Sequence, residues 1–330
     1  MLLRLLFLIA TLAALASPAL AETRAESAMA ARVQALGSGF DGHAGIAVID
    51  LMDGWTVSWN GDDRFSQESV AKLWTVIATL GAVDAGRMDL DQEVPFTRAD
   101  LSVFHEPLEA RVGSSVTVAE LVRDAIVESD NAANDLLVRR LGGTAAVQET
   151  IRRKGITGVA AGVQQRELQA HIAGLPWRPG LDGGERLEAA RERLDPSVRE
   201  AAMRRYLADP EDGATPLATV RALKALAEGR LLSPASTQRL LALMHSTVHG
   251  EERLNGGLGR GWTLAHKTGT GQRLGPLHVG TNDVGILTAP DGHAYAAAVF
   301  GGASSAPLVV REGLMRRVAE AVVATWQAER

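Results

Sequence analysis

The sequence contains no cysteine among its 330 residues. This absence excludes a cysteine nucleophile, disulfide bonds and a lipid-modified N-terminal cysteine. Disulfides are permitted in exported proteins, so an exported chain without them must be held together by its hydrophobic core. Hydrophobic residues make up 46% of the sequence and charged residues 22%, which is typical of a folded globular protein.

The chain also lacks the surplus of positive charge that nucleic-acid binding requires, because its formal net charge is −5. It has no signature of a metal or nucleotide site either. His245 and His249 have the i,i+4 spacing of two metal ligands, but no H-E-x-x-H motif and no third ligand accompany them. The glycine-rich segment 256–261 has no phosphate-loop lysine. We therefore expect no cofactor, no metal and no nucleic-acid partner.

The N-terminal residues 1–21 have the pattern of a secretory signal peptide. Arg4 supplies the positive charge, residues 5–16 are apolar, and Ala19-Leu20-Ala21 forms an A-x-A cleavage site. The apolar segment is too short for a membrane-spanning helix, which needs about 20 residues. The pattern predicts a periplasmic or secreted protein with no stable membrane anchor after cleavage.

The predicted strands lie toward both ends of the chain and the helices in the middle. This order favours an α+β fold, in which an antiparallel sheet with flanking helices forms one lobe (22–66 and 226–330) and helices form the other (67–225). The helical lobe carries an enlarged insert around 151–214. The alternation and turn signals predict strands over 43–50, 55–60, 262–267, 281–288 and 293–300.

A serine and a lysine stand one helical turn apart at Ser69 and Lys72, before a strongly apolar run. A serine hydroxyl is a poor nucleophile unless a proton acceptor lies beside it. A lysine can be that acceptor when burial or neighbouring cations lower its pKa. S-x-x-K alone is weak evidence, but Ser129-Asp130-Asn131 and Lys267-Thr268-Gly269-Thr270 follow in the order that penicillin-recognising serine enzymes share.

On these motifs the chain resembles the class A β-lactamases and, more widely, the penicillin-binding protein and β-lactamase superfamily. The resemblance covers nearly the whole chain after residue 21, including the stretch DGATPLATVRALKALAEGRLLS and the AHKTGTG that follows it. It implies a serine hydrolase that opens β-lactam rings through an acyl-enzyme, on a two-lobed fold.

The resemblance implies a role for each motif residue. Ser69 is then the acylated nucleophile, Lys72 takes its proton, and Ser129 passes a proton to the lactam nitrogen. The backbone N–H groups of Ser69 and Thr270 form the oxyanion hole. The residues that bind the substrate are Asn131 at the side-chain amide, Lys267, Thr268, Gly269 and Thr270 at the carboxylate, and Phe104 as an aromatic wall.

One family feature is missing. Class A enzymes carry R-x-x-E-x-x-x-N between S-D-N and the T-P helix start, and its glutamate activates the water that hydrolyses the acyl-enzyme. No such pattern occurs between Ala132 and Pro216, and this segment is longer than the family usually has. Glu167 is the best substitute for that glutamate, and Glu200 the next.

The missing glutamate keeps two alternatives open. One is a D-alanyl-D-alanine carboxypeptidase or esterase on the same scaffold, and the other is a protein that binds a β-lactam or peptidoglycan fragment covalently and does not turn over. In each case the expected partner is a small β-lactam or peptidoglycan-like molecule, and we expect a monomer.

Overall fold

The computed structural model describes residues 24–103 and 106–330. The predicted signal peptide and Phe104 lie outside the described residues. Among the described helices, none has the length and apolar character needed to cross a bilayer.

A five-stranded antiparallel sheet forms the centre of one lobe, in the order β2-β1-β9-β8-β5. As the alternation and turn signals predict, the strands come from the two ends of the sequence. Their bounds are β1 Ala44–Asp50, β2 Thr56–Trp59, β5 Thr263–Thr270, β8 Thr281–Thr288 and β9 Ala294–Gly301. The pairing of β1 with β9 therefore joins the N-terminal hairpin to the C-terminal strands.

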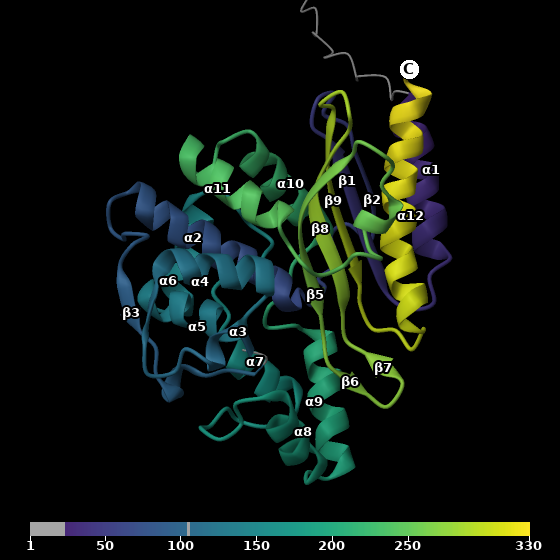
Figure 1. Cartoon of the computed structure of the whole chain (residues 1–330). Coiled ribbons are helices and arrows are strands. Elements are labelled where there is room, and N and C mark those ends of the chain that lie inside the picture. Colours follow the sequence, from purple (N-terminus) through teal and green to yellow (C-terminus); the bar gives the residue numbers. More distant parts are fainter. Residues whose placement is uncertain (1–23, 104–105) are drawn as a thin grey trace, which may run out of the picture.

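Helices cover both faces of this sheet, which explains why β1 is buried along its whole length. Ile46 and Val48 pack toward the terminal helices α1 (Arg24–Ser38) and α12 (Leu308–Ala328), in one apolar cluster. The intervening residues Ala47 and Ile49 belong to a second cluster, which continues into the helical lobe. Figure 1 shows α1 and α12 side by side on one face of the sheet and α10 on the other.

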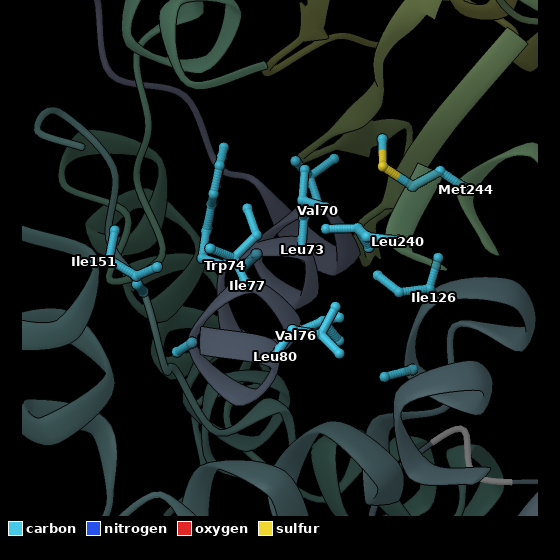
Figure 2. Packing of buried hydrophobic residues seen from close by; sticks show 14 of the residues in the cluster. Val70, Leu73, Trp74, Val76, Ile77, Leu80, Ile126, Ile151, Leu240 and Met244 are labelled. Carbon is cyan, nitrogen blue, oxygen red and sulfur yellow. The ribbon is translucent and has the colours of Figure 1, made fainter. Parts of the chain in front are cut away.

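The helix α2 (Lys72–Asp84) runs through the centre of the helical lobe, and nearly all its residues are buried. Figure 2 shows its apolar side chains pointing into the surrounding helices, with Leu240 and Met244 of α11 on one side and Ile151 of α6 on the other. A helix that is apolar all round needs this kind of enclosure. Burial of α2 therefore fixes the position of the residues at its N-terminus.

The other elements complete the lobes and the insert. The helices are α3 Glu106–Glu109, α4 Val118–Arg123, α5 Asn131–Arg140, α6 Thr144–Arg153, α7 Gln165–Ile172, α8 Gly184–Glu192, α9 Pro196–Ala208, α10 Pro216–Ala227 and α11 Pro234–His245, with a π-helix at Asp124–Glu128 and 3-10 helices at Glu68–Ala71, Arg98–Asp100 and Asn255–Gly257. Two small hairpins pair β3 (Glu93–Pro95) with β4 (Ser115–Thr117), and β6 (Arg273–Leu274) with β7 (Leu277–His278).

At the K-T-G and S-x-x-K motifs, an element boundary differs from the sequence-based prediction. The strand β5 does not stop at Lys267 but continues to Thr270, which pairs with Thr281. Gly269 permits this because a Cβ there would lie 2.3 Å from the backbone oxygen of Gln67. Ser69 lies in the 3-10 helix Glu68–Ala71 and not in α2 itself, and Glu68 at the start of this 3-10 helix has a left-handed backbone with φ of 54°.

Candidate active site

Ser69 and Lys72 meet at the N-terminus of α2. The Nζ of Lys72 donates to the Oγ of Ser69 at 2.6 Å, and it lies 3.4 Å from the Oγ of Ser129. Lys72 is completely buried, whereas Ser69 is only half-buried and lines a cavity. The side chain that would accept the proton is thus enclosed, and the hydroxyl that would react is open to a ligand.

Burial lowers the pKa of Lys72 to about 8, although the carboxylates of Asp135 and Asp130 oppose this shift. A lysine ammonium in water is almost fully charged at neutral pH. With a pKa near 8, a sizeable minority of Lys72 is neutral and has a lone pair for the Ser69 proton.

Ser129 connects Lys72 to the second lysine of the site. The Nζ of Lys267 donates to the Oγ of Ser129 at 2.9 Å and to the backbone oxygen of Thr268 at 3.1 Å. Ser129 has a left-handed backbone with φ of 60° and follows directly after the π-helix. Burial, and then the charge of Lys72, lower the pKa of the fully buried Lys267 well below its usual range. A negatively charged ligand group beside Lys267 would restore its ammonium form.

The rest of the S-D-N motif shapes the wall of the site. Asp130 caps α5 by accepting from the backbone N–H of Ala133 at 2.9 Å, and burial raises the pKa of Asp130 to about 6. Asn131 is buried, and its Nδ2 donates to the backbone oxygen of Val103. That bond fixes the Asn131 amide at the edge of the cavity.

The motif residues gather around one cavity of about 500 Å³. Ser69, Ser129, Asn131, Thr268 and Thr270 all contribute to its lining. Lys72 and Lys267 are buried directly behind two of them, Ser69 and Ser129. Segments far apart in the sequence therefore contribute to a single pocket between the sheet and the helical lobe.

Arg253 is a residue of this cavity that the sequence analysis missed. Its Nη2 donates to the Oγ1 of Thr270 at 2.7 Å, and its Nη1 donates to the backbone oxygens of Gly269 and Asn282. The arginine is buried and its Nε lies 3.2 Å from Glu312. A guanidinium next to Thr270 suits a ligand carboxylate. No motif in its loop, VHGEERL, indicates this position.

The structure does not bring Glu167 to the cavity. Its Oε1 accepts from the Nε2 of Gln164 at 3.2 Å, while Gln169, two residues further along α7, lines the cavity instead. Residues two apart on a helix point in nearly opposite directions, so Gln169 and Glu167 cannot both face Ser69. Glu200 also lies elsewhere: it is on α9, pairs with Arg204 at 3.4 Å and borders a different groove.

A buried carboxylate does lie next to the nucleophile, at a residue that the sequence analysis did not select. Glu68 directly precedes Ser69, and its side chain contacts Tyr206 and Gln169. The backbone N–H of Glu68 donates to Asp212 at 2.5 Å. The S-x-x-K motif begins one residue later, so only the adjacency of an acid to Ser69 was visible in the sequence.

The two histidines at i,i+4 do not form a metal pair. His245 contacts the backbone oxygen of Leu264 through Nδ1, and His249 contacts that of Glu128 through Nε2. His249 nevertheless lines the cavity, which the sequence analysis did not predict. The α-helix ends at His245, so helical spacing does not extend to His249.

Comparisons with known proteins match beta-lactamases to almost the whole chain. A family model described as the beta-lactamase enzyme family matches residues 28–326. The beta-lactamase VEB-1 of Pseudomonas aeruginosa is 25% identical over 86% of this chain and 84% of its own length. The crystal structure of a beta-lactamase from Chitinophaga pinensis is 29% identical, superposes with a TM-score of 0.74, and is matched over 92% of this chain and 99% of that one. A structure of an ancestral class A beta-lactamase gives a TM-score of 0.72 at 29% identity, over 90% of this chain and 99% of that one.

Proposed function

The chain belongs to the beta-lactamase enzyme family and is a serine hydrolase of the beta-lactamase type, and we propose that it opens β-lactam rings through an acyl-enzyme at Ser69. The observation that carries the assignment to Ser69 is its 2.6 Å contact with the buried Lys72. A lysine with a lowered pKa in contact with a half-buried serine is the pairing that activates a hydroxyl nucleophile.

In the first half-reaction the Oγ of Ser69 attacks the lactam carbonyl, and neutral Lys72 takes the hydroxyl proton. The C–N bond of the ring then breaks, and Ser129 gives its proton to the departing nitrogen. Ser129 regains a proton from Lys72, whose Nζ lies 3.4 Å away. The net result is the transfer of one proton from Ser69 to the ring nitrogen, with Ser129 reprotonated and Lys72 returned to its neutral form.

The carboxylate of the substrate lies, in this proposal, at the end of the cavity formed by β5. Lys267, Thr268, Thr270 and Arg253 present an ammonium, two hydroxyls and a guanidinium there. Charge-assisted hydrogen bonds of this kind are stronger than neutral ones. The backbone N–H groups of Ser69 and Thr270 are our choice for the oxyanion hole, since both residues line the same cavity.

The second half-reaction needs a base for water, and the α7 side of the cavity offers the amide of Gln169. The acids that line the cavity elsewhere are engaged: Glu128 pairs with Arg123 at 2.6 Å, and Asp130 caps α5. We assign proton acceptance to Lys72 in this step as well. An amide cannot accept the proton of water in place of a carboxylate, so Lys72 has to serve both half-reactions and the acyl-enzyme should accumulate.

The two alternatives differ from this proposal in their second half-reaction or in their substrate. The named relatives are beta-lactamases, so neither a D-alanyl-D-alanine carboxypeptidase or esterase nor a stalled binding protein is favoured. We further propose that the protein acts as a monomer in the periplasm after removal of residues 1–21. The A-x-A pattern at residues 19–21 supports this location.

Time-resolved mass spectrometry of the protein with a penicillin tests the proposal. We expect one added penicillin mass on Ser69 that forms quickly and disappears slowly. The Ser69→Ala variant should form no adduct, while Ser304→Ala, which changes a buried serine of the sheet lobe, should still form it. An adduct of unchanged stoichiometry in Ser69→Ala would contradict the assignment.

A further inference from the structure

Behind the nucleophile, a hydrogen-bonded unit joins the residue before Ser69 to the enlarged insert. Glu68 accepts from the Oη of Tyr206 at 2.9 Å through one carboxylate oxygen and from the Nε2 of Gln169 at 3.1 Å through the other. The same Tyr206 Oη lies 2.9 Å from an oxygen of Asp212, whose second oxygen accepts from the backbone N–H of Glu68. All four residues are buried.

The number of protons in this unit follows from its geometry. The hydroxyl of Tyr206 has one proton, but it is in hydrogen-bond distance of two carboxyl groups, on Glu68 and Asp212. If both carboxyls were ionised, one of these contacts would join two acceptors without a proton between them. One carboxyl must therefore be protonated and donate to the phenol oxygen, while the phenol donates to the other.

Asp212 is the carboxyl that carries the extra proton. Burial raises the pKa of Glu68, but the donors Tyr206 and Gln169 and the positive charge of Lys72 favour its carboxylate form. Burial together with the charge of Glu68 raises the pKa of Asp212 to about 8. The shared proton is thus retained at neutral pH.

We propose that Glu68, Tyr206 and Asp212 are positioning residues for hydrolysis of the acyl-enzyme, and that one shared proton holds them together. This inference rests on the proposed function, and it concerns how the hydrolytic side of the cavity is held in place. The unit fixes the Gln169 amide through Glu68, and it fixes the backbone of the turn that presents Ser69 through Asp212.

The bond to Glu68 determines which way the Gln169 amide faces. Because the Nε2 of Gln169 donates to Glu68, the Oε1 of Gln169 is left as the acceptor. It accepts a hydrogen bond from the Nε2 of Gln272 at 2.8 Å. Gln169 and Gln272 both line the cavity with Ser69. A carbonyl oxygen held at this wall can accept a hydrogen bond from the attacking water and orient it, while Lys72 takes the proton.

The surrounding backbone leaves space for this carboxylate. A Cβ at Gly271 would lie 2.6 Å from the Oε1 of Glu68, and one at Gly280 would lie 3.4 Å from its Cγ. Besides its own members, the charged group that faces the unit is Lys72 on α2, and Arg64 lies beside the Asp212 loop through its bond to Pro210. Lys72 is too far into the serine site to replace the shared proton, because its Nζ is bonded to Ser69.

Loss of the proton should disrupt the unit. Above pH 8 the buried carboxylates of Glu68 and Asp212 would both be charged and would repel each other in a medium that screens charge poorly. The fraction of protein that keeps the proton falls about tenfold for each pH unit above the pKa. The rate of acyl-enzyme hydrolysis should decrease with this fraction, whereas the hydrogen-bonded unit stays intact below pH 7.

The test compares variants by the ratio of their deacylation rates to that of the wild type, which cancels the titration of Lys72. Asp212→Asn keeps a donor toward Tyr206 without a titrating proton. Its ratio should be close to one at pH 6.5 and should rise about tenfold per pH unit above 8. Asp209→Asn changes an exposed carboxylate on the same loop, and its ratio should stay constant.

Variants at Glu68 separate positioning from general structure. Glu68→Gln can still accept from Gln169 and donate to Tyr206. It should therefore deacylate normally at pH 6.5, and its deacylation rate should not decrease above pH 8. Glu68→Ala releases Gln169 and should slow deacylation at least about tenfold while changing acylation little, a split that a merely structural role would not produce. A pH-independent ratio for Asp212→Asn, or equal losses of acylation and deacylation in Glu68→Ala, would overturn the inference.

A readout without substrate keeps this inference distinct from the proposed function. Infrared difference spectra of the wild type should show a protonated carboxyl C=O band that disappears as the pH rises through 8, and Asp212→Asn should lack it. If the band is present but no penicillin adduct forms, the proposed function fails and the acid unit stands. If adducts form but the band is absent, the proposed function stands and the shared proton does not exist.

Discussion

The dependence of acylation on the protonation of Lys72 is the sharpest test of the serine-lysine pair. Burial lowers the pKa of Lys72 to about 8. About a tenth of Lys72 is then neutral at pH 7 and about a hundredth at pH 6. Acylation of Ser69 should therefore rise about tenfold between pH 6 and pH 7 and level off above 8, where Lys72 is mostly neutral.

Rapid-quench mass spectrometry of the penicillin adduct between pH 5.5 and 8 measures this rate directly. Lys72→Ala should lose both the pH dependence and about 10²–10⁴ of the rate, the usual contribution of a general base. Lys154→Ala is a matched control, because Lys154 is also partly buried and burial also lowers its pKa, but it binds the backbone oxygen of Leu231 and borders a different cavity. Its pH profile should equal that of the wild type.

Two results would refute this reasoning about Lys72. Acylation that does not change between pH 5.5 and 8 would mean that no group with a pKa near 8 accepts the proton. A pH slope that survives in Lys72→Ala would assign the titration to another residue.

Three further predictions address ligand binding, the core and the discarded base. Lys267→Ala should weaken the acylation transition state by about 1.5–3 kcal/mol for substrates with a carboxylate, the range for hydrogen bonds to charged groups, and equal losses with a neutral ester would make Lys267 structural. Ile77→Ala removes a fully buried α2 side chain and should lower the free energy of unfolding in urea by about 2–5 kcal/mol, whereas Val309→Ala, at a 71% exposed position, should change it little. Glu167→Gln should leave steady-state turnover unchanged because Gln169 occupies the cavity wall, and a loss above about a hundredfold, the low end of general-base effects, would return Glu167 to the site.

The parts of the fold that depend on local patterns were predictable from the sequence. The strands at both ends of the chain were confirmed because alternating and turn residues mark them, and the S-x-x-K spacing places Lys72 beside Ser69 by helical geometry alone. Thr117-Val118-Ala119-Glu120 has the capping-box pattern in the sequence, and Thr117 and Glu120 form that box at the start of α4. These features need only neighbours within a few residues.

Arg253 and Tyr206 were not predictable because their partners are distant in the sequence. Arg253 donates to Thr270, which lies 17 residues further along the chain, and Tyr206 contacts Glu68 from the insert, over a separation of 138 residues. Nothing local to α9 indicates that Tyr206 contacts Glu68. Glu167 illustrates a different difficulty, since the choice between it and Gln169 depends on the rotation of α7, which a sequence without neighbours does not determine.

The buried carboxylate of Glu68 depends on residues of the enlarged insert. A carboxylate at Glu68 cannot move away from the nucleophile, because its own backbone forms the turn before Ser69. It is also buried, and burying it without partners would cost several kcal/mol. Tyr206 and Asp212 come from the insert and its end, and they supply the donor and the shared proton that make this burial tolerable. Tyr206 and Asp212 thus stabilise a different acid directly behind the serine, and they belong to the enlarged segment where a hydrolytic glutamate is missing. Removing α9 should therefore disturb the position of the Glu68 side chain before it affects Lys72 or Ser129.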